Sequence, residues 1–147
     1  MNRFFESLGE FARFIPRVII AEKIAELEAR SEIAMLLTHE VKDRLGKPDR
    51  LLPKLKESTQ DRREAAGYSR DETLLMTGKL RDSIGWEHAS AFKTIVGSTD
   101  EKAVWHELGP TNGHFPARSF LASTVAEKEA EAFELYVKTF GVSFKPR

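Results

Sequence analysis

The sequence contains no cysteine, which excludes disulfides, thiol catalysis and zinc sites built from cysteine. It also lacks net charge, because 23 basic side chains balance 23 acidic ones. Proteins that bind nucleic acid generally carry a basic excess, so the sequence predicts no specific nucleic-acid partner. A net charge near zero favours association between copies over their mutual repulsion.

Long apolar runs are absent as well. None approaches the roughly 20 residues that span a bilayer, and Glu6 and Glu10 interrupt the N-terminal stretch where a signal peptide would have its apolar core. The sequence therefore predicts a soluble, intracellular protein with no membrane partner. Its 147 residues, 41% of them hydrophobic, predict a single domain over 1–147 with a packed core.

Helical periodicity dominates the N-terminal third. Apolar residues from Phe4 to Ile15 predict a short amphipathic helix with Asn2 as its cap. Pro16 suits the first turn of a second, long helix over 16–45, which Gly46 and Pro48 would end. Its stripe follows a heptad spacing and consists of Ile20, Ile24, Leu27, Ser31, Ala34, Thr38, Val41 and Leu45. Two interpretations remain open: a helix that faces the core, or a helix–helix seam between subunits.

The helical spacing of apolar residues does not continue into residues 46–73, where prolines, Gly67 and charges of both signs occur instead. We predict a flexible segment here, with a short helix from about Ser58 to Ala66, that acts as a functional loop or orders on assembly. A further strand over 46–57 or 110–118 is another possibility.

The remaining segments alternate strand and helix signals. Thr77 is predicted to cap a helical turn over Gly78–Ser83, and two alternating runs, 84–89 and 92–97, predict a hairpin. Asp100 would cap a helix over 101–108, and Ser119 or Ser123 would cap a last helix that ends near Phe140, before a loose tail over 141–147. The apolar stripe of that last helix is Ala126, Ala130, Phe133, Val137 and Phe140. The predicted class is α+β, with a long N-terminal helix and a C-terminal helix packed on a small antiparallel β-sheet.

No constellation of residues predicts catalysis. His106, Glu107 and His114 invite a metal interpretation, but no third ligand has suitable spacing, so packed or hydrogen-bonded histidines are expected. Neither a nucleophile elbow nor a phosphate-binding loop is present. Trp105 and Phe120 are expected in the core. Arg81 and Arg118 are expected at the surface or in ion pairs, where an arginine fork could pin a loop or clamp a neighbour's carboxylate.

One sequence pattern resembles a known family. The run from Leu74 to Ile84, with Thr77-Gly78-Lys79-Leu80-Arg81 at its centre, resembles a motif of the tailed-phage virion morphogenesis proteins, which include the tail-completion and neck (head–tail joining) proteins. Three further segments, at their natural order and spacing, also resemble that family: Leu52–Leu55 upstream, Val96-Gly97-Ser98 followed by Ala103, His106, Glu107 and Gly109, and Pro116–Leu121. Lys102 and Ser119 depart from it, where the family often has tyrosine and proline.

The resemblance implies a structural virion protein without catalysis or cofactor. It would form a homo-oligomeric ring, possibly a hexamer, at the head–tail junction or tail end, in the virion and, during assembly, in the bacterial host cytoplasm. Its partners would be itself and the phage head-connector and tail-tube proteins. The alternatives are a small metal- or nucleic-acid-dependent enzyme, or a regulatory binding module, encoded with phage genes. The candidate fold and interface residues are Thr77, Gly78, Leu80, Arg81, Ile84, Trp105, Gly109, Arg118, Phe120 and Leu121.

Overall fold

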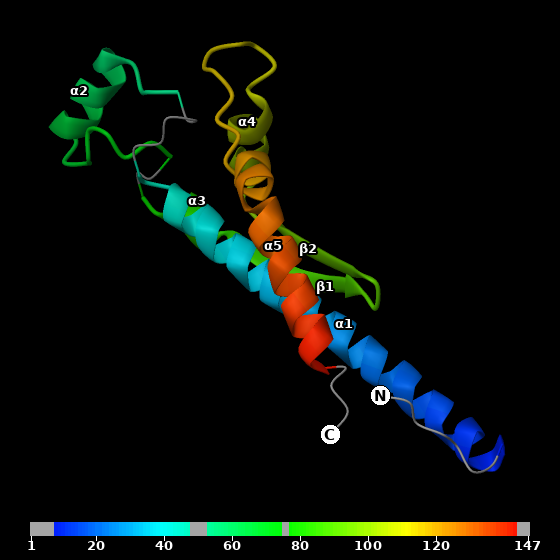
Figure 1. Ribbon diagram of the computed structural model, residues 1–147. Coiled ribbons are helices and arrows are strands. Elements are labelled where there is room, and N and C mark those ends of the chain that lie inside the picture. Colours follow the sequence, from blue (N-terminus) through cyan, green and yellow to red (C-terminus); the bar gives the residue numbers. More distant parts are fainter. Residues whose placement is uncertain (1–7, 48–52, 75–76, 144–147) are drawn as a thin grey trace.

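The protein is a mixed α and β chain with long helices at both ends (Figure 1). Its structure, a computed structural model, describes residues 8–47, 53–74 and 77–143, with the backbone alone for 8–18 and 142–143. This architecture confirms the predicted α+β class. In chain order the elements are α1 (Leu8–Arg44), α2 (Glu57–Ala65), α3 (Lys79–Asp82), β1 (Ile84–Ser90), β2 (Lys93–Ser98), α4 (Lys102–Leu108) and α5 (Leu121–Ser143).

Helix α1 is continuous through Pro16, so the predicted division into two helices at this proline is wrong. A proline inside a helix removes one backbone hydrogen bond and costs about 3 kcal/mol. The residues on both sides of Pro16 share the same helical periodicity, and one lost hydrogen bond does not end the helix. The predicted cap, Asn2, lies outside the described residues.

One face of α1 packs against the hairpin formed by β1 and β2. The Arg30 side chain donates to the Ala91 carbonyl at the hairpin tip, and the Ser31 hydroxyl lies 3.1 Å from Nε2 of His88. Further along, Val41 and Leu45 enter the core beside Ile84 of β1. These residues of α1 belong to the heptad stripe. The C-terminal half of the stripe therefore faces the core, in agreement with the first of the two interpretations.

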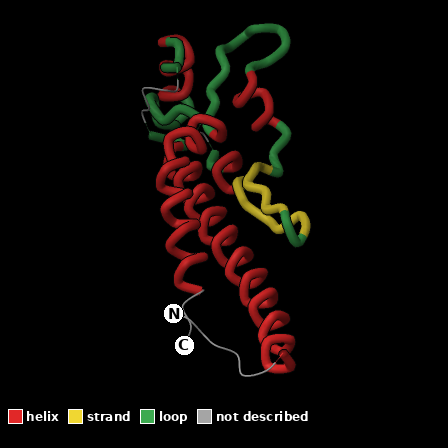
Figure 2. The backbone as a smooth tube through the Cα atoms, turned by 45° about the vertical axis from the view of Figure 1, so that its right-hand side comes forward, coloured by secondary structure: helices red, strands yellow, loops and turns green. Residues whose placement is uncertain are grey.

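A second face of α1 packs against α5, which runs antiparallel to it (Figure 2). Near one end Arg44 donates to the Ser123 hydroxyl at 2.9 Å and pairs with Glu127. One turn further along α1, Glu40 pairs with Lys128 at 3.4 Å. The apolar residues beside the heptad stripe serve this second contact, since Leu36 lies across a groove from Leu135.

The two strands form the predicted antiparallel hairpin. Ile84 pairs with Ser98 and Trp86 with Val96, and an irregularity between His88 and Ser90 disturbs the register near the turn. Ile84 is buried while the end of β1 is exposed, because the hairpin extends from the core toward solvent. No additional strand occurs in 53–57 or 110–118, the described parts of the ranges where one was considered.

The core is small and lies where α1, β1, α4 and α5 meet. Val41, Leu45, Ile84, Ala103 and Phe120 form it, and Leu74, Leu80 and Leu121 pack around them. Five of these residues come from the segment that runs from Leu80 to Leu121, which explains why this segment carries most of the positioned residues in the sequence.

Helix α2 confirms the short helix predicted within 46–73, and it ends before Gly67, whose φ is +79°. It is polar on all sides, and local contacts hold it. Arg63 donates to the Glu72 carbonyl at 2.9 Å, while Arg70 pairs with Asp61 and Glu64. The flexibility predicted for 46–73 stays a prediction, and residues 48–52 lie outside the described part.

The last two helices confirm the predicted elements. Asp100 accepts from the Lys102 N–H at 2.9 Å and so caps the start of α4. Helix α5 runs to Ser143, beyond the predicted end near Phe140, so the first residues of the predicted loose tail are helical and 144–147 lie outside the described residues. Its predicted apolar stripe is largely in solvent, since Phe133 is 68% and Val137 53% exposed.

The turn before α3 differs in detail from the prediction. Gly78, with φ +79°, occupies the N-cap position, and the Thr77 hydroxyl accepts from the Lys79 N–H at 3.5 Å, the outer limit for a hydrogen bond. Thr77 is therefore an acceptor two residues away, as predicted, but not the N-cap residue.

We expect Gly78→Ala to destabilise the fold more than Thr77→Ala. A left-handed conformation costs a non-glycine residue about 1–2 kcal/mol, whereas loss of the long contact from exposed Thr77 should cost under about 0.5 kcal/mol. Urea denaturation of both variants measures the two losses. An equal or larger loss for Thr77→Ala would show that the hydroxyl is a full cap.

Candidate functional site

The four segments of the virion-protein resemblance meet at one place in the fold. Ile84 after α3, Ala103 of α4 and Phe120 before α5 share the core, with Leu80 and Leu121 packed against it. The upstream segment joins them, because Nε of Arg118 donates to the Pro53 carbonyl at 3.1 Å. We call this convergence of 53, 77–84, 103–109 and 116–121 the junction.

The centre of the junction is the carboxylate of Glu107, which caps the N-terminus of α5. It accepts from the backbone N–H groups of Phe120, Leu121 and Ala122 at 2.9, 2.9 and 2.8 Å, and from the Ser119 hydroxyl at 2.7 Å. The first N–H groups of a helix have no partner within the helix, so this side chain satisfies three of them. The negative charge also lies at the positive end of the helix dipole.

The prediction that Ser119 or Ser123 caps this helix is therefore wrong. The Ser119 hydroxyl donates to Glu107, and the Ser123 hydroxyl donates back to the Ser119 carbonyl. Both serines are local candidates by sequence, whereas the observed cap comes from another helix. No local pattern marks Glu107 for this role; the sequence shows it only beside His106, as a candidate metal ligand and as part of the family motif.

Gly109 and Arg118 hold the loop between α4 and α5. Gly109 has φ +80°, a backbone conformation that residues with a side chain rarely adopt, so the backbone favours glycine here. The backbone N–H of Arg118 donates to the His106 carbonyl at 2.6 Å. Arg118 is buried, and burial lowers the pKa of its guanidinium. Its side chain donates to the Pro53 carbonyl and so holds the loop in place, which is one of the roles predicted for this arginine.

His106 is half-buried beneath this loop. Its ring lies 5.6 Å from that of Phe115, and within the described residues its Nδ1 is buried without a hydrogen-bond partner. Burial, followed by the nearby positive charge of Arg118, lowers the pKa of the imidazole below its ordinary 6.5. The neutral ring is therefore the stable form.

These residues do not assemble a metal centre. Both Glu107 oxygens are engaged by the four donors of the cap, and His114 lies in the exposed part of the loop. Across the described ranges, no group of three or more His, Cys, Asp or Glu side chains could hold a metal ion. In the same residues, no helix is long and apolar enough to cross a bilayer.

The other candidate residues divide between core and surface. Phe120 is fully buried, as predicted, but Trp105 is 52% exposed, so its predicted core position is wrong. Trp105 faces outward because the short helix α4 turns Ala103 to the core and Glu107 toward α5. Arg81 is exposed and lies 3.8 Å from its neighbour Asp82, in agreement with the surface position predicted for it.

The structure also brings together a serine and a histidine that the sequence separates widely. Nε2 of His88 is 3.1 Å from the Ser31 hydroxyl, and Nδ1 is 2.8 Å from the Thr94 hydroxyl. Ser31 donates its own proton to the Leu27 carbonyl at 2.9 Å, so His88 donates to Ser31 and does not act as its base. The pair thus joins α1 to the hairpin and lacks the arrangement of an activated nucleophile.

Comparison with protein-family models, curated proteins and solved structures finds no match for this chain.

We expect Glu107→Ala to destabilise the protein by about 2–3 kcal/mol, because hydrogen bonds to a charged group are each worth about 1.5–3 kcal/mol and the freed N–H groups regain only partial solvation. Chemical denaturation measures the loss. Glu101→Ala, at an exposed glutamate of the same helical region, is the matched control and should change stability by under about 0.5 kcal/mol. Equal losses for the two variants would contradict the cap.

We also expect stability to fall on mild acidification through His106. Since its folded pKa is lowered, this group's contribution is fully present above the ordinary value of 6.5 and is lost as pH falls through the folded pKa. Melting temperatures between pH 8 and pH 5 measure the effect. His106→Gln should flatten this dependence, whereas His114→Gln, at an exposed histidine, should retain it. Parallel profiles for all three proteins would rule His106 out.

Proposed function

We propose that this protein is a structural component of a tailed phage or prophage virion, which forms a homo-oligomeric ring at the head–tail junction or tail end during assembly. The proposal rests on the resemblance of four ordered segments to the virion morphogenesis family. In its support, those segments form one structural junction whose polar groups stabilise the chain and are not arranged to act on a substrate.

The observation that carries the proposal is the amount of apolar surface on the single chain. Large apolar side chains that are about half or more exposed occur on several elements: Ile20 and Ile24 on α1, Phe92 at the hairpin tip, Val104, Trp105 and Leu108 on α4, and Phe133 and Val137 on α5. The densest group is Val104, Trp105 and Leu108, because all three come from the seven residues of α4. We take this group as a surface that another chain covers in the assembly.

The proposed ring uses head-to-tail contacts, in which two different surfaces of each copy meet. We assign the 46–73 segment and the loop from Gly109 to Arg118 to these contacts. Helix α2 and the loop after α4 both project from the body in Figure 1, and Arg118 links the loop to the first segment through the Pro53 carbonyl. The further partners are the head-connector and tail-tube proteins of the same phage, and no cofactor is required.

Size-exclusion chromatography with light scattering tests the ring, and electron microscopy of negatively stained particles tests its closure. We expect a defined multiple of the 16.7 kDa chain. Replacing residues 56–68, which contain α2, by a short glycine–serine linker should leave a folded monomer that joins no heads to tails. The matched control replaces the exposed charges of α2 one at a time and should leave the ring intact.

A linker variant that still assembles would show that 56–68 only connects, and that the contacts lie elsewhere. A full-length chain that stays monomeric at every concentration would contradict the proposed function itself.

A further inference from the structure

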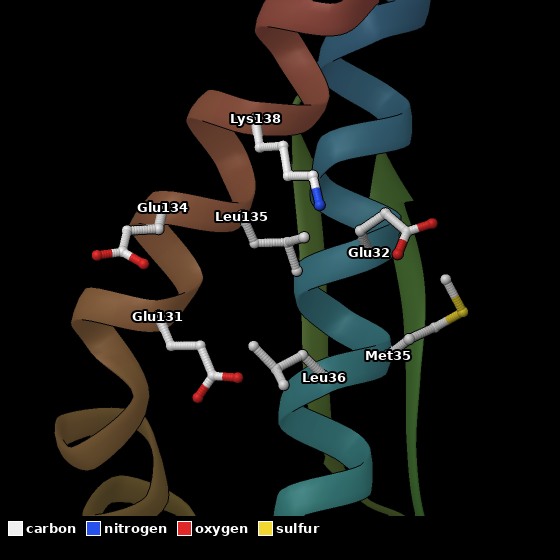
Figure 3. A pocket seen from close by; sticks show the side chains of 7 residues that line it. All are labelled: Glu32, Met35, Leu36, Glu131, Glu134, Leu135 and Lys138. Carbon is white, nitrogen blue, oxygen red and sulfur yellow. The ribbon is translucent and has the colours of Figure 1, made fainter.

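An open groove lies between α1 and α5 (Figure 3). Its volume is about 530 Å³. Leu36 of α1 and Leu135 of α5 project into the space between the two helices, and Met35, which is 45% exposed, lies at its edge. These side chains give the groove an apolar floor that is open to solvent, so it can take up apolar side chains of another segment.

The rim of this groove is acidic. Its lining contains one basic residue, Lys138, and three exposed glutamates, Glu32, Glu131 and Glu134. In Figure 3 the carboxylates of Glu32 and Glu131 lie on opposite sides of the apolar floor. An occupant with basic side chains on either side of apolar ones would therefore match the groove in charge as well as in polarity.

The acidic character extends along both helices. Residues 22–40 of α1 and 127–138 of α5 together contain nine glutamates and four lysines or arginines. Counting Arg44, which reaches Glu127 from outside these ranges, five basic side chains stand against nine carboxylates. The helix pair is thus a negatively charged region in a chain whose net charge is zero. Its internal ion pairs include those of Arg30 with Glu26 and of Lys128 with Glu40 and Glu131.

A segment of the opposite charge lies at residues 47–56. It contains one acidic residue, Asp49, and three leucines, at 51, 52 and 55. Its basic residues are Lys47, Arg50, Lys54 and Lys56. In the described part of this segment all three lysines are exposed. Apolar and basic side chains thus alternate along a short stretch, which is the chemistry that the groove calls for.

Acidic neighbours do not cancel the charge of this segment. Asp61 and Glu64 of α2 both pair with Arg70. Among the other charged residues of 53–62, which are Lys54, Lys56, Glu57 and Arg62, the basic ones outnumber the one glutamate. Lys47 pairs with Asp43 across one turn at the end of α1, and this pair is exposed.

A chain in this conformation does not place the segment in its own groove. The Pro53 carbonyl is held by Arg118, just before α5 begins, whereas the groove is lined by residues 131–138 of that helix. From Leu121 to Leu135 the helix rises by about 21 Å. Figure 1 shows the same separation, with α2 beyond one end of the α1–α5 pair.

We infer that the groove between α1 and α5 of one copy receives the segment 47–56 of the next copy. This contact rests on the proposed ring and names the surface that faces its 46–73 segment. Because segment and groove are different surfaces, each copy uses one toward each neighbour, as a head-to-tail ring requires. The loop from Gly109 to Arg118 lies on the same side of the chain as the segment, since Arg118 bonds to Pro53, and so it faces the same neighbour.

A charge swap tests this contact. Lys54→Glu with Lys56→Glu reverses the segment, and Glu32→Lys with Glu134→Lys reverses the groove. Each pair of substitutions alone should reduce the mass in light scattering to that of one chain, 16.7 kDa, with an unchanged circular dichroism spectrum. All four substitutions in one chain should restore the ring, because opposite charges then meet again.

The matched control reverses two exposed lysines that belong to neither surface. Lys79→Glu with Lys93→Glu makes the same change in net charge as the segment variant. It should leave the mass of the assembly unchanged. A loss of assembly in this control as well would mean that net charge, and not this contact, governs the mass, which would overturn the inference.

Cross-linking provides a second measurement that needs no loss of assembly, because the chain has no cysteine of its own. Met35→Cys places a thiol at the edge of the groove and Lys54→Cys places one in the segment, and both positions are exposed. With a short bismaleimide, the two single variants should give a covalent dimer when co-expressed and none when separate. The double variant should give a ladder of covalent oligomers up to the full ring.

The other outcomes separate the contact from the proposed function. Rings that persist in both reversed variants, or that the four substitutions together do not restore, would place the contact elsewhere and leave the proposed function intact. An assembly of two chains with the same rescue would support the contact and contradict the ring. A monomer of the unaltered chain at every concentration would overturn both.

Discussion

The cap that Glu107 places on the first turn of α5 is the interaction on which the rest of the structure depends. Four donors converge on one carboxylate, and three of them are backbone N–H groups that the helix itself cannot satisfy. This fixes α5 against α4, and α5 in turn covers one face of α1. Without it the small core around Phe120 would have little to hold its walls together.

The junction around that cap explains why residues of several kinds occur at fixed intervals in this part of the chain. Gly109 permits the sharp turn after α4, and buried Arg118 reaches back to the Pro53 carbonyl. His106 contributes its carbonyl to the loop and keeps a neutral ring beneath it. Each of these groups makes its described contact with another part of the same chain.

Helix α1 is divided into a covered and an open half. The same heptad stripe serves the core from Ser31 to Leu45 and emerges into solvent from Leu27 toward the N-terminus. Core packing, the first of the two interpretations of that stripe, is thus observed in its C-terminal half, whereas Leu27, Ile24 and Ile20 stay exposed on the single chain. A stripe has the same appearance in sequence whichever surface covers it.

Local patterns determined which elements form. The hairpin, the short helix α2 and the Asp100 cap of α4 follow from alternation, turn residues and capping side chains, all of which act over a few residues. Tertiary structure decided the rest, because contacts between distant residues have no local signature. It placed Glu107 rather than a serine at the start of α5, and it left Trp105 and Phe133 exposed. In each case the outcome depended on which surface another element covers.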